Sequence, residues 1–378
     1  MRSRFFLFLM LALLPACSRQ RNAGGGTDWT IFRGDPSLTG YADVRIPDRL
    51  DLLWSFTTGP RTVSSPVVRD GITYWADRRG RLYGVDATGT QVFDRDLATF
   101  IEATPLIRDT VLYIGTIDGH LLAIGLGSGE TLWDYATEGQ VSASPNLAHF
   151  RDRDAIVFGS YDCYFYCLDA GDGSLINRFE SGYYLNGAAA LWEDSVLFGG
   201  CDQWLRLVHC GSGVQTDSLR LDAYIPASPA VREGLAYIGD YDGNIYEIQL
   251  REGRIASSRK LYEAGPDDSG FESVPAVDGN AIYAYTGGQQ LLAMSRKDGR
   301  ILWSRMLKGS PGESAPLVCR NRVIACTKSG IVSVLDKSDG SVLWEYDAGE
   351  DILGSPAVLR DRFLVLTAKG TLLCFGNK

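Results

Sequence analysis

Short apolar runs alternate with polar turns along almost the whole chain from residue 50 onward, and no apolar stretch there has the length or period of a helix. Runs of this length bounded by Gly, Asp and Asn are typical of β-strands joined by tight turns. One pattern recurs, a small residue followed by proline and an apolar run. It occurs at Ser65-Pro66, Thr104-Pro105, Ser144-Pro145, Ser228-Pro229, Val274-Pro275, Ala315-Pro316 and Ser355-Pro356.

The spacing of this pattern defines a repeat. Successive prolines are separated by 39, 40, 84, 46, 41 and 40 residues. The spacing of 84 equals two periods, and in its middle residues 187–191 keep the small-then-apolar pattern without a proline. The chain therefore contains eight units of about 41 residues, a period typical of a ring of similar units.

Each unit predicts four antiparallel strands. The apolar run after the proline is followed by a polar turn, a second strand, a glycine hairpin such as Asp118-Gly119, a third strand, and a glycine turn into a last strand. Four strands in about 41 residues form one propeller blade. The final unit ends at Lys378 without a fourth strand, and we expect residues 52–56 to supply it. The predicted fold is all-β, a single eight-bladed propeller closed by an N-terminal strand.

The turn into the fourth strand carries a second motif. Residues 123–133, 293–303 and 334–344 resemble the Ala-x-Asp-x-x-Thr-Gly-x-x-x-Trp docking motif of pyrroloquinoline quinone (PQQ) propeller repeats. In this motif the glycine turns the chain and the aromatic ring packs between blades. Blades three to five have Asn177, Asp217 and Ser257 at the aromatic position, which predicts weaker docking. The blade-docking residues are expected to be Trp54, Phe93, Trp133, Trp303 and Trp344.

The repeats, together with the preceding segment Trp29–Gly40, make the chain similar to two groups of eight-bladed PQQ-like proteins. One group is the quinoprotein dehydrogenases, and the other is the BamB-type outer-membrane assembly lipoproteins. The first resemblance would imply a quinone with Ca²⁺ and a catalytic Asp, and the second a non-catalytic scaffold. The repeat motif argues for the fold and only weakly for the chemistry.

The N-terminus predicts export and lipidation. Arg2 and Arg4 precede an apolar run over residues 5–14, which is too short to cross a bilayer as a helix. Residues 14–17, Leu-Pro-Ala-Cys, resemble a bacterial lipobox. The alternative is an ordinary signal with a chance cysteine. We expect a signal peptide over 1–16, a lipidated tether over 17–28 anchored at Cys17, a lead-in segment over 29–49 and the propeller over 50–378. Ser18 resembles the outer-membrane sorting pattern, so the expected location is the periplasmic side of the outer membrane.

Composition excludes some functions. Hydrophobic residues make up 45% and charged residues 22% of the chain, which is ordinary for a globular protein. The formal net charge of −9 argues against nucleic-acid binding, because a phosphate backbone needs a basic face.

The sequence contains little that predicts catalysis. No Cys-Cys pair is present, although quinoprotein dehydrogenases commonly have one, and the blades lack long insertions. The three His have no metal-ligand spacing, and Asp169 to Asp172 and Asp336 to Asp339 are interpreted as turn caps. We therefore expect no enzyme activity, no metal and no cofactor, with PQQ and Ca²⁺ disfavoured.

Seven cysteines follow Cys17, an odd number for an exported chain. A Cys163–Cys201 bridge between neighbouring blades is one hypothesis. Buried, unbridged cysteines are the alternative, and it is favoured.

A partner site is expected at the mouth of the central channel, formed by the segments before each first strand. Three of the seven positions that lie three residues before a proline are Glu. With nearby aromatic residues they would suit a basic or mixed peptide. Alternatively these Glu are solvated, or are paired with Arg61. A second candidate contact is the acidic insertion over 265–270. The expected mouth residues are Glu102, Glu272, Glu313, Tyr184, Tyr224 and Phe271.

Two hypotheses follow for function. The first is a lipid-anchored, monomeric, non-catalytic scaffold that binds envelope proteins, in outer-membrane protein assembly. The alternative is a PQQ or small-ligand binder or a quinoprotein oxidoreductase. A sensor or carbohydrate-binding module is a third possibility, but the sequence shows no stacked aromatic set.

Overall fold

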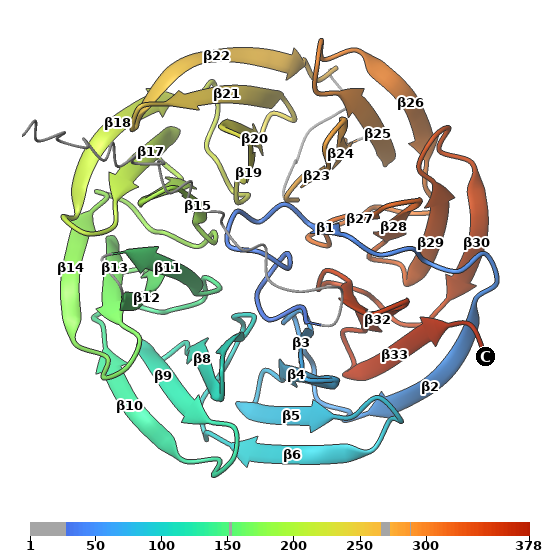
Figure 1. Ribbon diagram of the computed structural model, residues 1–378, viewed down its shortest axis with the longest axis horizontal. Coiled ribbons are helices and arrows are strands. Elements are labelled where there is room, and N and C mark those ends of the chain that lie inside the picture. The colour runs from blue at the N-terminus through green and yellow to red at the C-terminus, as the bar shows by residue number, and fades with distance from the viewer. Residues whose placement is uncertain (1–27, 151–152, 266–272, 288) are drawn as a thin grey trace, which may run out of the picture.

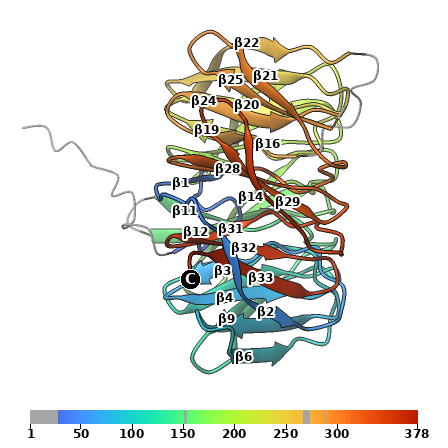
Figure 2. The same ribbon diagram turned by 90° about the vertical axis from the view of Figure 1, so that its right-hand side faces the viewer.

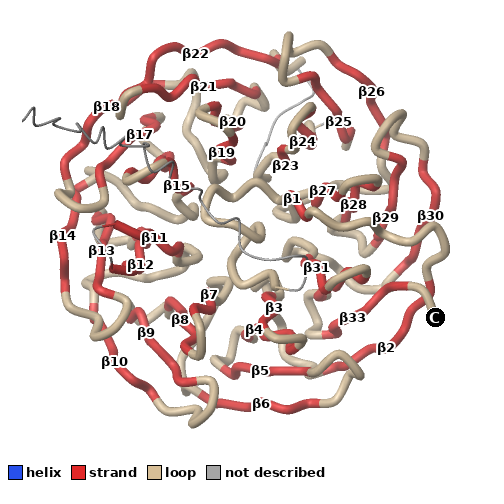
Figure 3. The backbone as a smooth tube through the Cα atoms, in the orientation of Figure 1, coloured by secondary structure: helices blue, strands red, loops and turns tan. Residues whose placement is uncertain are grey.

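The computed structural model describes residues 28–150, 153–265, 273–287 and 289–378. These residues form eight sheets arranged as a ring around a central axis (Figure 1). Strands and loops make up the described chain, without a helix (Figure 3). Accordingly, no described segment is a helix long and apolar enough to cross a membrane. The prediction of eight four-stranded blades is confirmed.

The blades follow one another along the chain, and within each blade the first strand is innermost. Blade 1 comprises β3 (Val67–Arg69), β4 (Ile72–Ala76), β5 (Arg81–Val85) and β6 (Gln91–Asp96). Blade 2 comprises β7 (Leu106–Arg108), β8 (Val111–Gly115), β9 (His120–Gly125) and β10 (Thr131–Ala136). Blade 3 comprises β11 (Asn146–Phe150), β12 (Arg153–Gly159), β13 (Tyr164–Asp169) and β14 (Leu175–Glu180). Blades 4 and 5 comprise β15 (Ala190–Trp192), β16 (Ser195–Gly199), β17 (Trp204–His209) and β18 (Val214–Arg220); and β19 (Ala230–Arg232), β20 (Leu235–Gly239), β21 (Ile245–Arg251) and β22 (Arg254–Tyr262). Blade 6 comprises β23 (Ala276–Val277), β24 (Ala281–Tyr285), β25 (Gln290–Ser295) and β26 (Ile301–Met306). Blade 7 comprises β27 (Leu317–Cys319), β28 (Arg322–Cys326), β29 (Ile331–Asp336) and β30 (Val342–Asp347), with β1 (Tyr41–Ala42) added at its inner edge. Blade 8 comprises β31 (Ala357–Leu359), β32 (Arg362–Leu366), β33 (Thr371–Gly376) and β2 (Asp51–Thr57).

The ring is closed by the N-terminal strand. Strand β2 pairs antiparallel with β33, from Asp51 opposite Gly376 to Thr57 opposite Thr371. Both views of the molecule place β2 beside β33 (Figures 1 and 2). The sequence expectation for residues 52–56 is therefore confirmed, and the outermost strand of blade 8 comes from the opposite end of the chain.

The Ser or Thr before four of the prolines has a structural role that the sequence did not reveal. The hydroxyl of Thr104 accepts a hydrogen bond from the Ser65 N–H at 3.0 Å, and that of Ser65 accepts one from the Ser355 N–H at 2.9 Å. Similar bonds join Thr104 N–H to Ser144 and Ala315 N–H to Ser355. Each bond links one blade to the next, including the closing pair of blades 8 and 1. The motif thus satisfies buried backbone donors around the channel.

The lead-in segment lines the central channel and crosses the innermost strands in order. The carbonyl groups of Trp29, Thr30, Pro36, Ser37, Thr39 and Gly40 accept hydrogen bonds from the N–H groups of Val68, Ile107, Leu191, Val231, Val277 and Val318, all at 2.8–2.9 Å. The Asn146 side chain of blade 3 also donates to Pro36, at 2.7 Å. Seven of the eight blades are therefore bonded to one short segment, which covers inner edges that would otherwise lack partners. Figure 1 shows this blue segment crossing the centre of the ring.

Arg33 anchors the lead-in segment to blades 6 and 7. Its side chain is 1% exposed and donates to the Pro316 carbonyl at 2.6 Å. Burial lowers the pKa of Arg33 to about 10. Gly40, at a φ of 61°, lies against the guanidinium, so any side chain at residue 40 would displace Arg33. This contact fixes the path of the segment toward β1, which pairs in parallel with β27.

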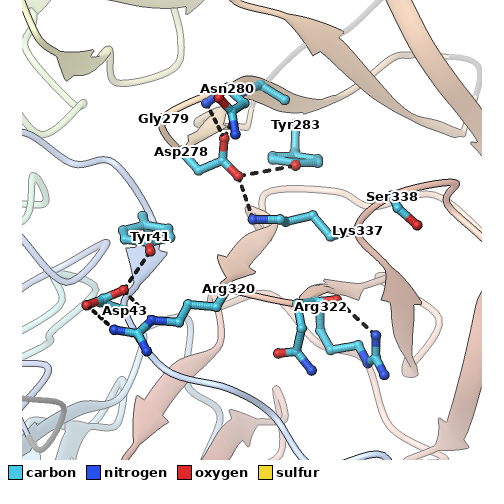
Figure 4. Close-up of polar contacts among 12 residues, drawn as sticks. Tyr41, Asp43, Asp278, Gly279, Asn280, Tyr283, Arg320, Arg322, Lys337 and Ser338 are labelled. Carbon is cyan, nitrogen blue, oxygen red and sulfur yellow. Dashed lines mark hydrogen bonds and ion pairs between the residues drawn. The ribbon is translucent and has the colours of Figure 1, made fainter.

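The lead-in segment leaves the channel over blade 7, where Asp43 accepts hydrogen bonds from Arg320 Nε and Nη2 at 2.6 and 2.7 Å and from the Tyr41 hydroxyl at 2.8 Å (Figure 4). These hydrogen bonds lower the pKa of Asp43 to about 2. An unfolded Asp has a pKa near 3.9, so between about pH 4 and pH 2 the unfolded chain binds more protons than the folded one.

We therefore predict that this contact stabilises the fold above about pH 4 and is lost as the pH falls through about 2. Because both side chains are more than half exposed, its contribution is small. Unfolding titrations of Asp43→Asn and the parent chain should converge as the pH approaches 2. A difference that stays constant from pH 7 to pH 2 would contradict this assignment.

The tryptophans of the glycine-turn motif lie between neighbouring blades. The indole N–H groups of Trp54, Trp133 and Trp303 donate to the carbonyls of Ala87, Ala170 and Lys337 in the following blade, at 2.9, 3.1 and 3.0 Å. A Cβ placed on Gly173 or Gly340 would clash with the rings of Trp133 or Trp303, and one on Gly89 would be in tight contact with the ring of Trp54. The motif glycine therefore has two roles: it takes a positive φ, and it leaves room for the ring of the preceding blade.

The remaining positions of this motif differ from the tryptophan pattern. Asn177 of blade 3 donates to the Cys210 carbonyl, and Asp217 of blade 4 accepts from the Ile255 N–H at 3.0 Å. Polar bonds thus replace the ring there. Phe93 lies against Tyr74 of its own blade, with ring centroids 5.7 Å apart. Gly129, the motif glycine of the next blade, has open space where a Cβ would lie, so no aromatic ring packs over it. Trp344 packs on Phe375 of blade 8, with centroids 5.2 Å apart.

Candidate functional site

The propeller has two sides with different surfaces. One end of the propeller carries the segments that enter each blade and the hairpins between second and third strands, and we call this end the interblade side. The opposite end carries the turns between first and second strands and the turns between third and fourth strands, and we call it the turn side. Of the expected mouth residues, Glu102, Glu313, Tyr184 and Tyr224 belong to segments of the interblade side. Phe271 and Glu272, with most of the 265–270 insertion, lie outside the described residues.

The interblade side is built by a repeated backbone contact. In most blades an N–H of the hairpin donates to a carbonyl of the segment entering the same blade, as from Ile117 to Phe100 and from Tyr241 to Tyr224, both at 2.9 Å. This contact holds the residues at these positions side by side. Two residues that are 17 apart in sequence therefore become neighbours on the surface.

Aromatic rings lie at these hairpins around blades 3 to 5: at both paired positions of blade 5, and between the hairpin of blade 3 and the segment that enters blade 4. Tyr224 and Tyr241 stack with centroids 4.1 Å apart, and Tyr161 and Tyr184 stack at 5.5 Å. Tyr183 packs edge-on against Tyr184 at 5.2 Å. Tyr184 is half exposed. The expectation that no stacked aromatic set exists was wrong for these tyrosines, because the stacking joins residues of different segments.

Carboxylates surround the tyrosines and also hold the hairpins. Asp162 accepts from the Tyr166 hydroxyl at 2.7 Å and Asp240 from the Tyr246 hydroxyl at 2.8 Å. Asp222 accepts from the Tyr246 hydroxyl at 3.0 Å and lies 2.9 Å from Lys260 Nζ; these two hydrogen bonds lower its pKa. Burial and the hydrogen bonds to both carboxylates raise the pKa of Tyr246. Asp222 is thus ionised at neutral pH, and Tyr246 keeps its hydroxyl proton.

The other expected acidic residues lie in different surroundings. Glu102 forms an ion pair with Arg78, not with Arg61. Arg61 instead lines a depression of about 350 Å³ between blades 8 and 1, with Glu350, Asp351 and Lys369. Glu313 is exposed. The interblade side is therefore acidic and aromatic over blades 3 to 5, and of mixed charge near blades 8 and 1.

The cysteines and histidines form no reactive centre among the described residues. All seven cysteines after Cys17 are free, so the Cys163–Cys201 bridge is not formed; Cys163 Sγ instead lies near the Tyr161 carbonyl. Burial raises the pKa of Cys167 to about 12, which keeps this thiol protonated. His120 and His149 each bond a single carboxylate, of Asp134 and Asp154.

Among the described residues, the donor set does not fit a Ca²⁺ site of the kind that the dehydrogenases need. Within the part of the chain that the structure describes, no three His, Cys, Asp or Glu side chains come together as metal ligands. Asp169 and Asp336 accept turn N–H groups, as do Asp172 and Asp339. The lead-in segment also occupies the channel at the innermost strands of seven blades.

Comparisons with known proteins point in the same direction. The profile of a family described as outer membrane protein assembly factor BamB matches residues 43–259 and 241–376. The BamB of Shewanella oneidensis is 23% identical over 323 residues, which cover 79% of this chain and 69% of that protein. The BamB of Escherichia coli is 24% identical over 221 residues, which cover 58% of this chain and 42% of that protein.

Solved structures share the fold. The BamB of Moraxella catarrhalis aligns with a TM-score of 0.73 at 18% identity and covers 87% of this chain and 98% of its own. The quinohemoprotein alcohol dehydrogenase of Comamonas testosteroni aligns with a TM-score of 0.76 at 13% identity and covers 93% and 80%. At these identities the alignments show the eight-bladed architecture, which scaffolds and enzymes have in common.

Proposed function

Since this chain belongs to the family of the outer membrane protein assembly factor BamB, we propose that it is a non-catalytic scaffold that binds other envelope proteins during outer-membrane protein assembly. The location proposed with this function is the periplasmic face of the outer membrane, through a lipid on Cys17. That residue lies outside the described part of the chain, so lipidation stays a prediction. Mass spectrometry of the protein purified from membranes would test it.

One observation on the interblade side carries the proposal. Stacked tyrosines, held in place by the backbone bonds between segments and hairpins, are exposed over blades 3 to 5. Tyrosine is enriched among the residues that dominate protein–protein binding energy, because a rigid ring buries a large area at low entropic cost. The surrounding carboxylates would steer and orient a partner segment that carries Arg or Lys.

We predict that Tyr184→Ala with Tyr241→Ala weakens binding to purified outer-membrane assembly machinery at least tenfold. Such rings contribute about 2 kcal/mol when they anchor an interface. Surface plasmon resonance would measure the affinity. Leu132→Ser, on the outer strand of blade 2, is the matched control and should bind like the parent chain. Equal affinity for the parent and the tyrosine variant would contradict the proposed surface.

The cofactor hypothesis has a separate test. We propose that the protein binds no PQQ, since the described residues bring no metal ligands together and the lead-in segment occupies the channel. Titration of the full chain with PQQ and Ca²⁺, followed by quinone absorbance, is expected to give no saturable change at tens of micromolar. Saturable binding would favour the oxidoreductase alternative over the scaffold.

A further inference from the structure

The exposed apolar side chains divide into two chemically different sets at opposite ends of the propeller. On the interblade side they are aromatic apart from Met306, namely Phe100, Tyr183, Tyr184, Trp204 and Tyr241. Near the turn side they are all aliphatic and all lie at the start of outer strands, namely Val92, Leu132, Leu175, Val214, Ile301, Leu302, Val342 and Leu343. A surface that binds one protein partner does not require the second set.

A β-bulge produces the aliphatic set. In every blade the pairing of the outer strand shifts by one residue just after the turn, as between Ile301 and Trp303 in blade 6. The extra residue lets two consecutive side chains point outward. In blades 6 and 7 both of these are large and aliphatic, and Ile301, Leu302, Val342 and Leu343 are each 40–50% exposed.

These two blades are also neighbours at the turn side. The Trp303 indole donates to the Lys337 carbonyl, and Arg305 Nε donates to the Gly340 carbonyl at 2.8 Å. The four aliphatic side chains therefore lie on adjacent outer strands at the same end of the propeller. We refer to Ile301, Leu302, Val342 and Leu343 as the aliphatic rim.

The charges beside the aliphatic rim differ from those of the interblade side. Most acids on the turn side of blades 6 and 7 are paired with a cation, as Asp278 is with Lys337, Asp48 with Arg322 and Asp298 with Arg300. In contrast, three exposed cations of the turn side have no ion-pair partner within the described ranges: Lys297 in the outer turn of blade 6, Arg45 in the lead-in segment after β1, and Arg360 in the first turn of blade 8. Among the described residues, Asp339 in the outer turn of blade 7 and Asp361 in the first turn of blade 8 are acids without an ion-pair partner. Cations beside exposed aliphatic side chains favour the anionic surface of a bilayer.

The position of the N-terminal segment provides an independent argument. The described chain begins at Asp28, whose carboxylate accepts the Asp70 N–H at 3.0 Å in the first turn of blade 1, which is on the turn side. Ten residues separate Cys17 from Asp28. A chain of that length spans at most about 40 Å. A lipid on Cys17 would thus hold the turn side close to the membrane.

We propose that the aliphatic rim and its neighbouring cations contact the anionic lipid surface directly, so that the propeller rests with its turn side toward the membrane. The interblade side then faces away from the lipid and is open to protein partners. The lipid contact is separate from the partner surface of the proposed function, and each can fail without the other.

A chain that begins at Ser18 tests this contact without the lipid anchor, because it contains every described strand and therefore the complete closed ring. Flotation with vesicles of phosphatidylethanolamine and phosphatidylglycerol should show binding that weakens with added salt and with phosphatidylcholine alone. Leu302→Ser with Leu343→Ser should lower the vesicle affinity about tenfold, since each substitution removes apolar area from the contact.

The matched control is Val92→Ser with Leu132→Ser, at the same bulge position in blades 1 and 2, and it should leave binding unchanged. All four positions are exposed, so thermal unfolding should be the same for both variants. No flotation of the parent chain, or an equal loss in both variants, would overturn the assignment of blades 6 and 7. Tyr184→Ala with Tyr241→Ala should not affect flotation, which separates this test from that of the protein-binding surface.

Discussion

Trp303→Ala is expected to lower the free energy of unfolding by about 3–5 kcal/mol, the usual cost of truncating a buried tryptophan. Trp303 is 8% exposed, its indole N–H donates to the Lys337 carbonyl at 3.0 Å, and its ring fills the space above Gly340. The substitution would leave a cavity at the junction of blades 6 and 7 and a carbonyl without its donor. Urea titration followed by circular dichroism would measure the loss.

Trp204→Ala is the matched control, because the same side chain is removed from the surface. Trp204 begins the third strand of blade 4 and is 38% exposed. Its loss should cost less than about 1 kcal/mol, as for most surface substitutions. Similar losses in the two variants would show that Trp303 has no special role between the blades.

Lys337→Met is expected to lower the free energy of unfolding by about 2–4 kcal/mol, because removing one partner of a buried ion pair leaves the other charge uncompensated. Lys337 Nζ lies 2.9 Å from the carboxylate of Asp278, which is 3% exposed, and links blade 7 to blade 6 (Figure 4). Burial alone would raise the pKa of Asp278, but the N–H groups of Asn280 and Ala281 and the lysine together lower it.

The sign of the pH dependence distinguishes an ion pair from lost packing. The depressed pKa of Asp278 stabilises the parent chain above the pKa of an unfolded Asp, about 3.9, and this stability is lost as the pH falls through the folded value. Without the lysine the pKa of Asp278 should rise, so the difference between the variant and the parent should shrink as the pH falls.

The double variant Asp278→Asn with Lys337→Met is the control for this pair. An asparagine oxygen can still accept the N–H groups of Asn280 and Ala281, which now bond Asp278 at 2.8 Å. The double variant should therefore recover most of the stability that is lost in Lys337→Met. A double variant that is no more stable than the single one would show that the charge of Asp278 is not the cause.

The repeat made the fold predictable, because each blade carries the same local signals. A small residue before proline and a glycine four residues before tryptophan are visible in sequence, and closure followed from the missing last strand. The bonds between Thr104 and Ser65 and the contacts of the lead-in segment could not be found in this way. They join residues of different blades, and the lead-in segment has no repeat of its own.

The candidate site was only partly predictable. Tyr184 and Tyr224 were expected at the channel mouth from their position before a first strand, but their stacking partners Tyr161 and Tyr241 were missed. These partners occupy hairpins. The bond from the Tyr241 N–H to the Tyr224 carbonyl brings one pair of rings together, and the bond from the Leu185 N–H to the Ser160 carbonyl brings Tyr184 beside Tyr161. Aligning the hairpins of the eight repeats would have shown aromatic residues at this position in blades 3 and 5 only.

The most direct test of a scaffold that binds through its interblade side is photo-crosslinking in intact cells. A photoreactive residue at Tyr184 is expected to form adducts with a component of the outer-membrane assembly machinery. The same residue at Leu132, on the turn side of blade 2, should form none with that component. Adducts with the machinery at Leu132 but not at Tyr184 would contradict the assignment of the partner surface, and the absence of the machinery from all adducts would contradict the scaffold function itself.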